Sequence, residues 1–271
     1  MGPYKRQFEG DFARSRQDHP TWPVVISEGD SWFSYPFQRN IVDWLDDPGD
    51  TGDPNQQTPW ALFRLEGSGD QILSILSGGQ RASLRDYFSH YRPKVLLFSA
   101  GGNDIVGPDL LALLKDFTPG AAAADCLRND RLDRRLREIT DCYLELIDLC
   151  GDNSPGTTIV AHGYDYAIPS SEGVKLIGVR ITGPWMKPYF EQRGIPPAVQ
   201  TAIVKILIDR FNDEIIAPLA GPKFVYVDLR NAVGADWTNE IHPNRRGSKR
   251  TAARFKAALA PLLPGLPFPG L

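Results

Sequence analysis

Three short stretches of the chain carry side chains whose types could do chemistry together. Gly29-Asp30-Ser31 supplies a hydroxyl, Gly101-Gly102-Asn103-Asp104 a side-chain amide, and His242, followed by Pro243, an imidazole. A serine hydroxyl is a weak nucleophile until a base takes its proton, and imidazole suits that task near neutral pH. Amide and backbone N–H groups stabilise the oxyanion that forms when a carbonyl is attacked. These residue types indicate acyl transfer, provided that the fold brings them together.

The elements that must position these residues alternate along the chain. Nearly continuous apolar runs, typical of parallel strands buried on both faces, occur at 24–26, 94–99, 157–161 and 223–228, with a weaker run at 61–65. Helical patterns occur at 70–77, 80–90, 129–150, 197–219 and 247–263. This alternation predicts an α/β fold, a three-layer α/β/α sandwich around a mainly parallel sheet of about five strands. Sites in such sheets lie beyond the carboxyl ends of the strands, where the polar stretches fall.

In this order, and with a fourth stretch, Ser68-Gly69-Asp70, the pattern resembles the SGNH (GDSL-type) hydrolase superfamily. The blocks of that family match residues 29–31, 68–70, 101–104 and 239–243, which span nearly the whole chain. Gly-Asp-Ser alone is a weak signal, but four blocks in order, each near the end of a predicted strand, are a strong one. The resemblance implies a flavodoxin-like sandwich and a serine esterase or lipase-like activity that needs no cofactor.

The resemblance also implies a role for each matched residue. Ser31 would be the nucleophile and His242 the base. The oxyanion hole would consist of the backbone N–H groups of Ser31 and Gly69 and the side-chain amide of Asn103. Glycine at position 69 would let the backbone approach the substrate closely and adopt a positive φ angle.

One position departs from the family pattern. Three residues before His242, where the family has an aspartate that orients the imidazole, this chain has Asn239. An amide oxygen can accept the Nδ1–H of the imidazole, but it brings no negative charge. Three alternatives remain: a Ser–His dyad oriented by Asn239 or by the backbone, a carboxylate supplied by Asp236 through a tight turn, or a site that has lost turnover.

The segment 164–197 is too long for a minimal connection, which favours a functional loop or flap. It is rich in aromatic residues, and with rings elsewhere in the chain these could wall an apolar pocket for an acyl chain or an aromatic group. Rings also stack on sugars, so carbohydrate esters stay open as substrates. The predicted pocket residues are Trp32, Tyr164, Tyr166, Trp185 and Trp237.

Composition limits the remaining possibilities. The length of 271 residues predicts one domain, with the insertion at about 164–197 and an extended Pro-rich tail at 261–271. The net charge of −3 predicts no nucleic-acid partner. Its three cysteines show no C-x-x-C spacing and no apolar run could span a membrane or act as a secretory signal, so a cytoplasmic location is the default expectation. The histidines are not clustered, so we expect no metal. The acidic run 43–53 does not match a calcium-binding loop and predicts a solvated loop.

We therefore expect a carboxylic ester hydrolase that works through an acyl-enzyme, with a small-molecule ester or an acylated carbohydrate as its partner. A first alternative is an O-deacetylase of carbohydrate or peptidoglycan that uses the same Ser–His machinery. A second is a non-catalytic carbohydrate-binding module on the same fold, which asparagine at position 239 would permit.

Overall fold

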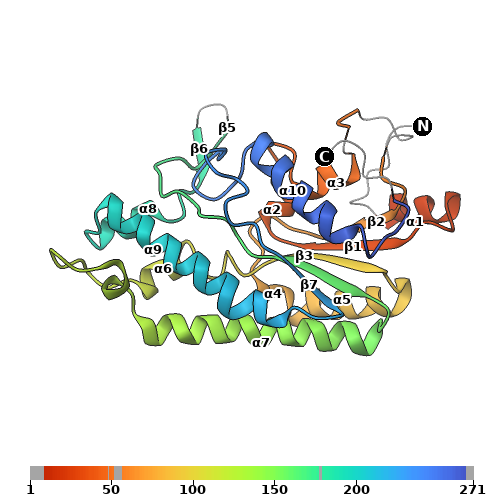
Figure 1. The fold of residues 1–271 in the computed structure, drawn as a ribbon, viewed down its shortest axis with the longest axis horizontal. Coiled ribbons are helices and arrows are strands. Elements are labelled where there is room, and N and C mark those ends of the chain that lie inside the picture. Colours follow the sequence, from red (N-terminus) through yellow and green to blue (C-terminus); the bar gives the residue numbers. More distant parts are fainter. Residues whose placement is uncertain (1–8, 48, 52–56, 177–178, 267–271) are drawn as a thin grey trace.

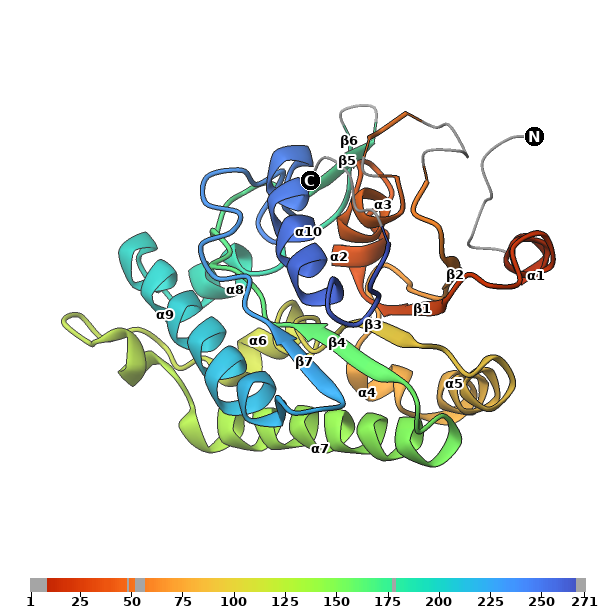
Figure 2. The same cartoon turned by 45° about the vertical axis from the view of Figure 1, so that its right-hand side comes forward.

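The centre of the molecule is a sheet of five parallel strands. The computed structural model describes residues 9–47, 49–51, 57–176 and 179–266. The strands lie in the order β2-β1-β3-β4-β7, and all neighbouring pairs are parallel (Figures 1 and 2). Their bounds are β1 Val24–Gly29, β2 Ala61–Arg64, β3 Val95–Ser99, β4 Thr158–His162 and β7 Phe224–Val227. All five predicted strands are confirmed to within a few residues at their ends.

Helices cover both faces of this sheet, which confirms the three-layer sandwich (Figure 1). One face carries α2 (Ser31–Ser34), α3 (Ile41–Asp46) and α10 (Arg245–Leu259). The other carries α4 (Ile72–Ile75), α5 (Gly78–Tyr91), α6 (Pro108–Leu113) and the long α7 (Asn129–Asn153). The predicted helix 197–219 is continuous but changes type, from α9 (Pro197–Arg210) through the π-helical η3 (Phe211–Ile216) to the 3₁₀ turn η4 (Ala217–Leu219). The remaining helices are α1 (Glu9–Asp18), η2 (Ala123–Cys126) and α8 (Lys187–Gln192).

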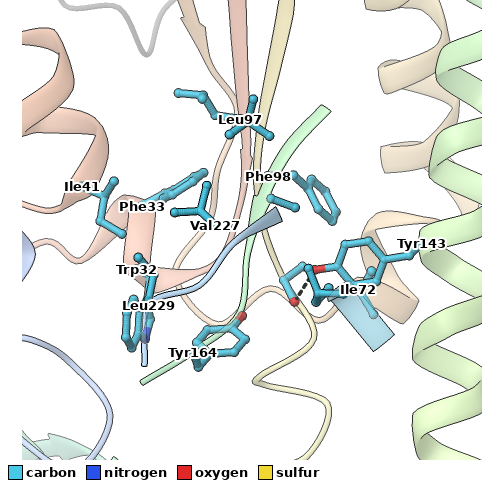
Figure 3. Close-up of a cluster of buried hydrophobic side chains, with 14 of the residues drawn as sticks. Trp32, Phe33, Ile41, Ile72, Leu97, Phe98, Tyr143, Tyr164, Val227 and Leu229 are labelled. Atoms are coloured by element: carbon cyan, nitrogen blue, oxygen red, sulfur yellow. Dashed lines mark hydrogen bonds between the residues drawn. The ribbon is translucent and has the colours of Figure 1, made fainter. Parts of the chain in front are cut away.

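The core lies on both faces of the sheet because strand residues of both orientations are buried. Every residue of β3 and β4 is buried, as expected for apolar runs in a parallel sheet. Phe33 of α2 and Ile41 of α3 belong to the core on one side of the sheet. Ile72 of α4 and Tyr143 of α7 belong to it on the other (Figure 3). The Tyr143 hydroxyl donates to the Ala100 carbonyl at 2.8 Å, so the chain leaving β3 is tied to α7.

The segment 164–197 contains a small antiparallel hairpin and a short helix. Strands β5 (Val174–Leu176) and β6 (Val179–Thr182) pair with each other rather than with the central sheet, and α8 follows them. The extended tail expected from 261 onward is wrong for residues 261–266, which form turns because Leu263 is buried against the core. Residues 267–271 lie outside the described residues. Among the described residues, none of the helices has the length and apolar character needed to cross a membrane.

Candidate active site

Gly29 ends β1 at a point where no side chain would fit. Its φ angle is +138°, and a Cβ at this position would lie 2.0 Å from the Ser99 carbonyl oxygen of neighbouring β3. The next residue, Asp30, donates its backbone N–H to that same carbonyl at 2.7 Å. This close contact turns the chain sharply out of the sheet, so that Ser31 starts α2 directly at the sheet edge.

The chain brings Ser31 and His242 into direct contact although they are 211 residues apart in sequence. The Ser31 Oγ lies 2.7 Å from Nε2 of His242, and Nδ1 of the same ring lies 2.9 Å from Oδ1 of Asn239. Oδ1 of Asn239 also accepts the backbone N–H groups of Ile241 and His242, while its Nδ2 donates to the Tyr35 hydroxyl. These contacts orient the amide with its oxygen towards the imidazole. We therefore assign the proton to Nδ1, which leaves Nε2 free to accept from Ser31.

Asp236, the alternative partner for the imidazole, lies elsewhere. Its carboxylate accepts from Arg250 at 2.6 Å and from the side chain of Asn244 at 3.2 Å. The Arg250 hydrogen bond lowers the pKa of Asp236. The backbone of Asp236 has a different role. Its carbonyl accepts the Asn244 N–H at 2.7 Å, which joins the two ends of the loop 236–244 that carries His242.

Aromatic rings enclose the imidazole of His242, which is only 3% exposed. The Tyr35 ring stacks on it at 4.1 Å between centroids, and Trp185 meets it edge-on at 5.2 Å. Burial lowers the pKa of His242 to about 3, because water is excluded from the charged form and no carboxylate partner offsets the loss. The imidazole is therefore neutral, and able to act as a base, over a wide pH range.

This low pKa sets an expected pH profile for ester hydrolysis. A base must be unprotonated, and His242, with its pKa lowered to about 3, becomes protonated only well below its usual 6.5. We expect kcat/KM for p-nitrophenyl acetate to remain level from neutral pH to about pH 4, where an unperturbed histidine would already have lost activity. Circular dichroism at each pH checks that the protein stays folded.

The variant Asn239→Asp provides the matched test of that assignment. It places a carboxylate beside Nδ1, and an opposite charge at that distance favours the imidazolium and raises the pKa of His242. The acid limb of the profile should then move upward towards neutral pH. A wild-type limb near pH 6 that this substitution leaves in place would instead point to buried Asp30, whose pKa burial raises to about 6.

Three groups that could hold an oxyanion border the same cleft as the Ser31–His242 pair. This outer cleft is lined by Ser31, Gly69, Asn103 and His242 and by the rings of Tyr35, Phe37 and Trp185, with Pro36, Ser68, Val174, Thr182 and Ile241. Gly69 has a φ angle of +93° and open space where a side chain would be. Nδ2 of Asn103 donates to the Asp70 carbonyl at 2.9 Å, which fixes the amide orientation and leaves its second N–H for another acceptor.

Comparison with known proteins agrees with this arrangement at the level of the fold. No family model matches the sequence, and no curated protein matches it significantly. Among solved structures, the lipase Lip_vut3 from a goat rumen metagenome superposes with a TM-score of 0.55 at 12% identity, covering 87% of this chain and 97% of the lipase. The chain shares the fold of this lipase, an α/β/α sandwich around a parallel sheet.

Two further solved structures are similar to the chain at lower scores. An extracellular lipase from Streptomyces rimosus matches with a TM-score of 0.49 at 16% identity, over 87% of this chain and 99% of the lipase. A family 3 carbohydrate esterase from Talaromyces cellulolyticus matches with a TM-score of 0.45 at 16% identity, over 90% of this chain and all of that chain.

Beneath the loop that carries Ser31 lies a buried hydrogen-bond network that the sequence did not reveal. Asp30 accepts from the Trp32 backbone N–H at 2.9 Å, from the Ser99 hydroxyl at 2.7 Å and from the Tyr164 hydroxyl. His162 Nε2 lies 2.7 Å from the Ser99 Oγ, and burial lowers the pKa of this histidine to about 4. This second Ser–His pair is fully buried, so it holds the loop and has no access to a substrate.

A second pocket, the inner pocket, meets the outer cleft at Ser31. Both are bordered by Ser31, Asn103 and Ile241. The walls of the inner pocket are mainly apolar and come from three regions: the loop after Asn103, the 164–186 segment, and α9 with η3. The side chains that form them include Ile105, Val106, Met186, Val204, Leu207, Ile208 and Phe211.

The structure places the five predicted pocket aromatics differently. Trp32 and Tyr164 line the inner pocket and Trp185 lines the outer cleft. Tyr166 and Trp237 line neither of these pockets, which corrects the prediction for both. The Tyr166 hydroxyl donates to Asp209 at 2.7 Å. The Trp237 indole N–H donates to the Gly234 carbonyl at 2.9 Å, and its ring lies behind Trp32, which it meets edge-on at 6.0 Å between centroids.

Proposed function

We propose that the protein is a serine hydrolase that cleaves carboxylic esters through an acyl-enzyme. The observation that carries this proposal is the row Asn239–His242–Ser31, in which the amide orients the imidazole and the imidazole accepts from the hydroxyl at 2.7 Å. A nucleophile, its base and the group that orients the base are the arrangement that activates a serine.

The proposed reaction proceeds in two halves. Ser31 Oγ attacks the carbonyl carbon while His242 Nε2 takes the hydroxyl proton, and the oxyanion accepts hydrogen bonds from the N–H groups of Ser31, Gly69 and Asn103. His242 then passes the proton to the departing alcohol, leaving an ester on Ser31. In the second half His242 takes a proton from water, and the water oxygen attacks the carbonyl carbon of this ester. The bond between that carbon and Ser31 Oγ then breaks, His242 returns the proton to Ser31 Oγ, and the acid is released. No step requires a metal or a cofactor.

The inner pocket supports an apolar acyl group as the part of the substrate that lies beside Ser31. Its polar residues are already engaged, because Asp165 accepts the N–H groups of Asn231 and Val233 and Asp30 is held by the network described above. Few polar groups therefore remain there to bind sugar hydroxyls. Alkyl or aryl groups fit such a wall.

The outer cleft supports the second candidate, an O-deacetylase acting on carbohydrate. Phe37 is 48% exposed and borders this cleft beside Tyr35 and Trp185, and exposed rings can stack on a sugar. In that case the sugar would occupy the outer cleft as the leaving alcohol, and only an acetyl group would enter the inner pocket.

A series of p-nitrophenyl esters, from acetate to octanoate, measured beside acetylated xylose distinguishes these candidates. If the inner pocket binds the acyl group, kcat/KM should rise about three- to fourfold with each added methylene until the pocket is filled. A marked preference for the acetylated sugar, with no gain from longer chains, would favour the deacetylase. If purified protein hydrolyses none of these esters, a non-catalytic module becomes the better explanation.

A further inference from the structure

Glu240 is a buried carboxylate that lies in sequence between Asn239 and His242, the pair joined by the hydrogen bond to Nδ1. Its side chain is fully buried, and a carboxylate in that environment requires hydrogen-bond donors. It has four, all of them backbone N–H groups. Oε1 accepts from Ser170 at 3.1 Å and from Lys187 at 2.8 Å, and Oε2 accepts from Met186 at 2.8 Å and from Trp185.

These donors come from both ends of the β5–β6 hairpin. Ser170 precedes β5, whereas residues 185–187 follow β6 and lead into α8. The Glu240 backbone contributes as well, since its carbonyl accepts the Ile168 N–H at 3.2 Å. A single residue therefore ties the entry and the exit of the hairpin to the loop that carries His242.

The tied residues form walls of both pockets. Trp185 borders the outer cleft and meets the His242 ring edge-on, while Met186 is buried and borders the inner pocket. The Trp185 carbonyl accepts the Gly107 N–H at 2.8 Å, which connects the same stretch to the loop that follows Asn103. The position of this stretch therefore determines the shape of both pockets around Ser31.

We propose that Glu240 is a positioning residue for substrate binding, holding the hairpin ends against the loop that carries the base so that Trp185 and Met186 stand at the walls of the two pockets. This role rests on the proposed esterase function. Only a carboxylate satisfies all four donors, because both of its oxygens accept, whereas glutamine would turn an NH₂ group towards two N–H groups. Buried donors left without an acceptor would drive the segment away from its position.

Glu240→Gln, assayed with p-nitrophenyl acetate and p-nitrophenyl hexanoate, tests the proposal. We expect KM for the hexanoate to rise about tenfold or more, because two buried N–H groups lose their acceptor and the pocket walls shift. kcat for the acetate should change less than about fivefold, since acetate contacts little of the walls and the Asn239–His242–Ser31 row keeps its own hydrogen bonds. Hydrogen exchange should be faster in peptides covering 168–174 and 182–187 and unchanged in β3.

Two further variants control for a loss of stability alone. Glu240→Asp keeps both acceptors and should recover part of the hexanoate KM. Asp46→Asn removes the charge of another buried carboxylate, one that lies outside both pockets. This carboxylate accepts the Trp60 indole N–H at 2.8 Å. The substitution should lower Tm without altering either KM or the exchange in peptides 168–174 and 182–187. If Glu240→Gln does not fold, Glu240→Asp decides: a raised hexanoate KM with faster exchange supports the proposal, and wild-type values of both overturn it.

A purely structural Glu240 would lower Tm and leave KM and the exchange pattern at their wild-type values, and that result rejects the proposal. Failure of the proposed function is a separate outcome. If the wild-type protein hydrolyses no ester, the exchange measurement still shows whether Glu240 holds the hairpin.

Discussion

Ser31→Ala is expected to lower kcat for p-nitrophenyl acetate by about 10⁵- to 10⁶-fold, the range seen when a serine nucleophile is removed from a site that works as a unit. The substitution deletes the oxygen that lies 2.7 Å from His242 and leaves the surrounding hydrogen bonds in place. Tm should change little, because the substitution removes only one hydroxyl, and this hydroxyl borders two pockets instead of packing in the core. Initial rates across a range of ester concentrations, together with a thermal melt, measure both quantities.

The buried Ser99–His162 pair offers a contrast within the same chain. Both serines lie 2.7 Å from an imidazole nitrogen, but Ser99 is fully buried. A fluorophosphonate probe should therefore label Ser31 alone, as mass spectrometry of the labelled peptide would show. Ser89→Ala, on the exposed side of α5, is the matched variant that should keep full activity. Label on another serine, or a Ser31→Ala protein that retains more than a tenth of the activity, would contradict the assignment of the nucleophile.

Asn103→Asp is expected to lower kcat by about 10²- to 10³-fold or more although the side chain keeps its shape, since removal of one oxyanion donor typically has that effect. Nδ2 of Asn103 is held by the Asp70 carbonyl, and a carboxylate there would face two oxygens, that carbonyl and the substrate oxyanion, with no proton to offer. KM for the acetate should change far less than kcat, because the donor acts on charge that develops in the transition state.

Asn103→Ser supplies the control, because its hydroxyl restores a donor at shorter reach and should recover part of the lost rate. If Asn103→Asp and Asn103→Ser lower kcat by the same factor and lower Tm by the same amount, Asn103 supports the loop rather than the oxyanion. A loss below tenfold in Asn103→Asp would exclude this amide from the oxyanion hole.

Much of the fold follows from short-range patterns. The apolar runs at 24–26 and 94–99 can be buried on both faces only inside a parallel sheet, so they predicted β1 and β3, and their carboxyl ends placed Ser31 and Asn103 at one edge. The positive φ at Gly69 was likewise expected from the residue type. Helix α3 was missed, because the acidic run 43–53 predicted a solvated loop. Asn40 and Asp43 in fact form a capping box, and Trp44 and Leu45 bury its apolar side.

Other features depend on contacts that no local pattern encodes. The partners of Glu240 are backbone N–H groups more than fifty residues away, so its residue type gives no hint of them. The inner pocket depends on the distance that separates α9 and η3 from the loop after Asn103. An apolar helix face predicts that the helix is buried, but it does not predict a cavity beside it. Tyr166 was misplaced for the same reason, because an aromatic residue near a site in sequence can turn towards a partner such as Asp209. Trp237 was misplaced because its ring packs behind Trp32 instead of reaching a pocket.

The amide at position 239 has an electrostatic consequence for the kinds of ester the site can admit. In the row Asn239–His242–Ser31 no member is charged before the reaction, because the buried imidazole is neutral and its partner cannot ionise. In the proposed reaction, attack on the ester creates one positive charge on the imidazole and one negative charge on the oxyanion. A row with aspartate in place of Asn239 would carry a negative charge before the attack. An anionic acyl group, such as the half-ester of a dicarboxylic acid, therefore meets no fixed repulsion from this row as it approaches Ser31.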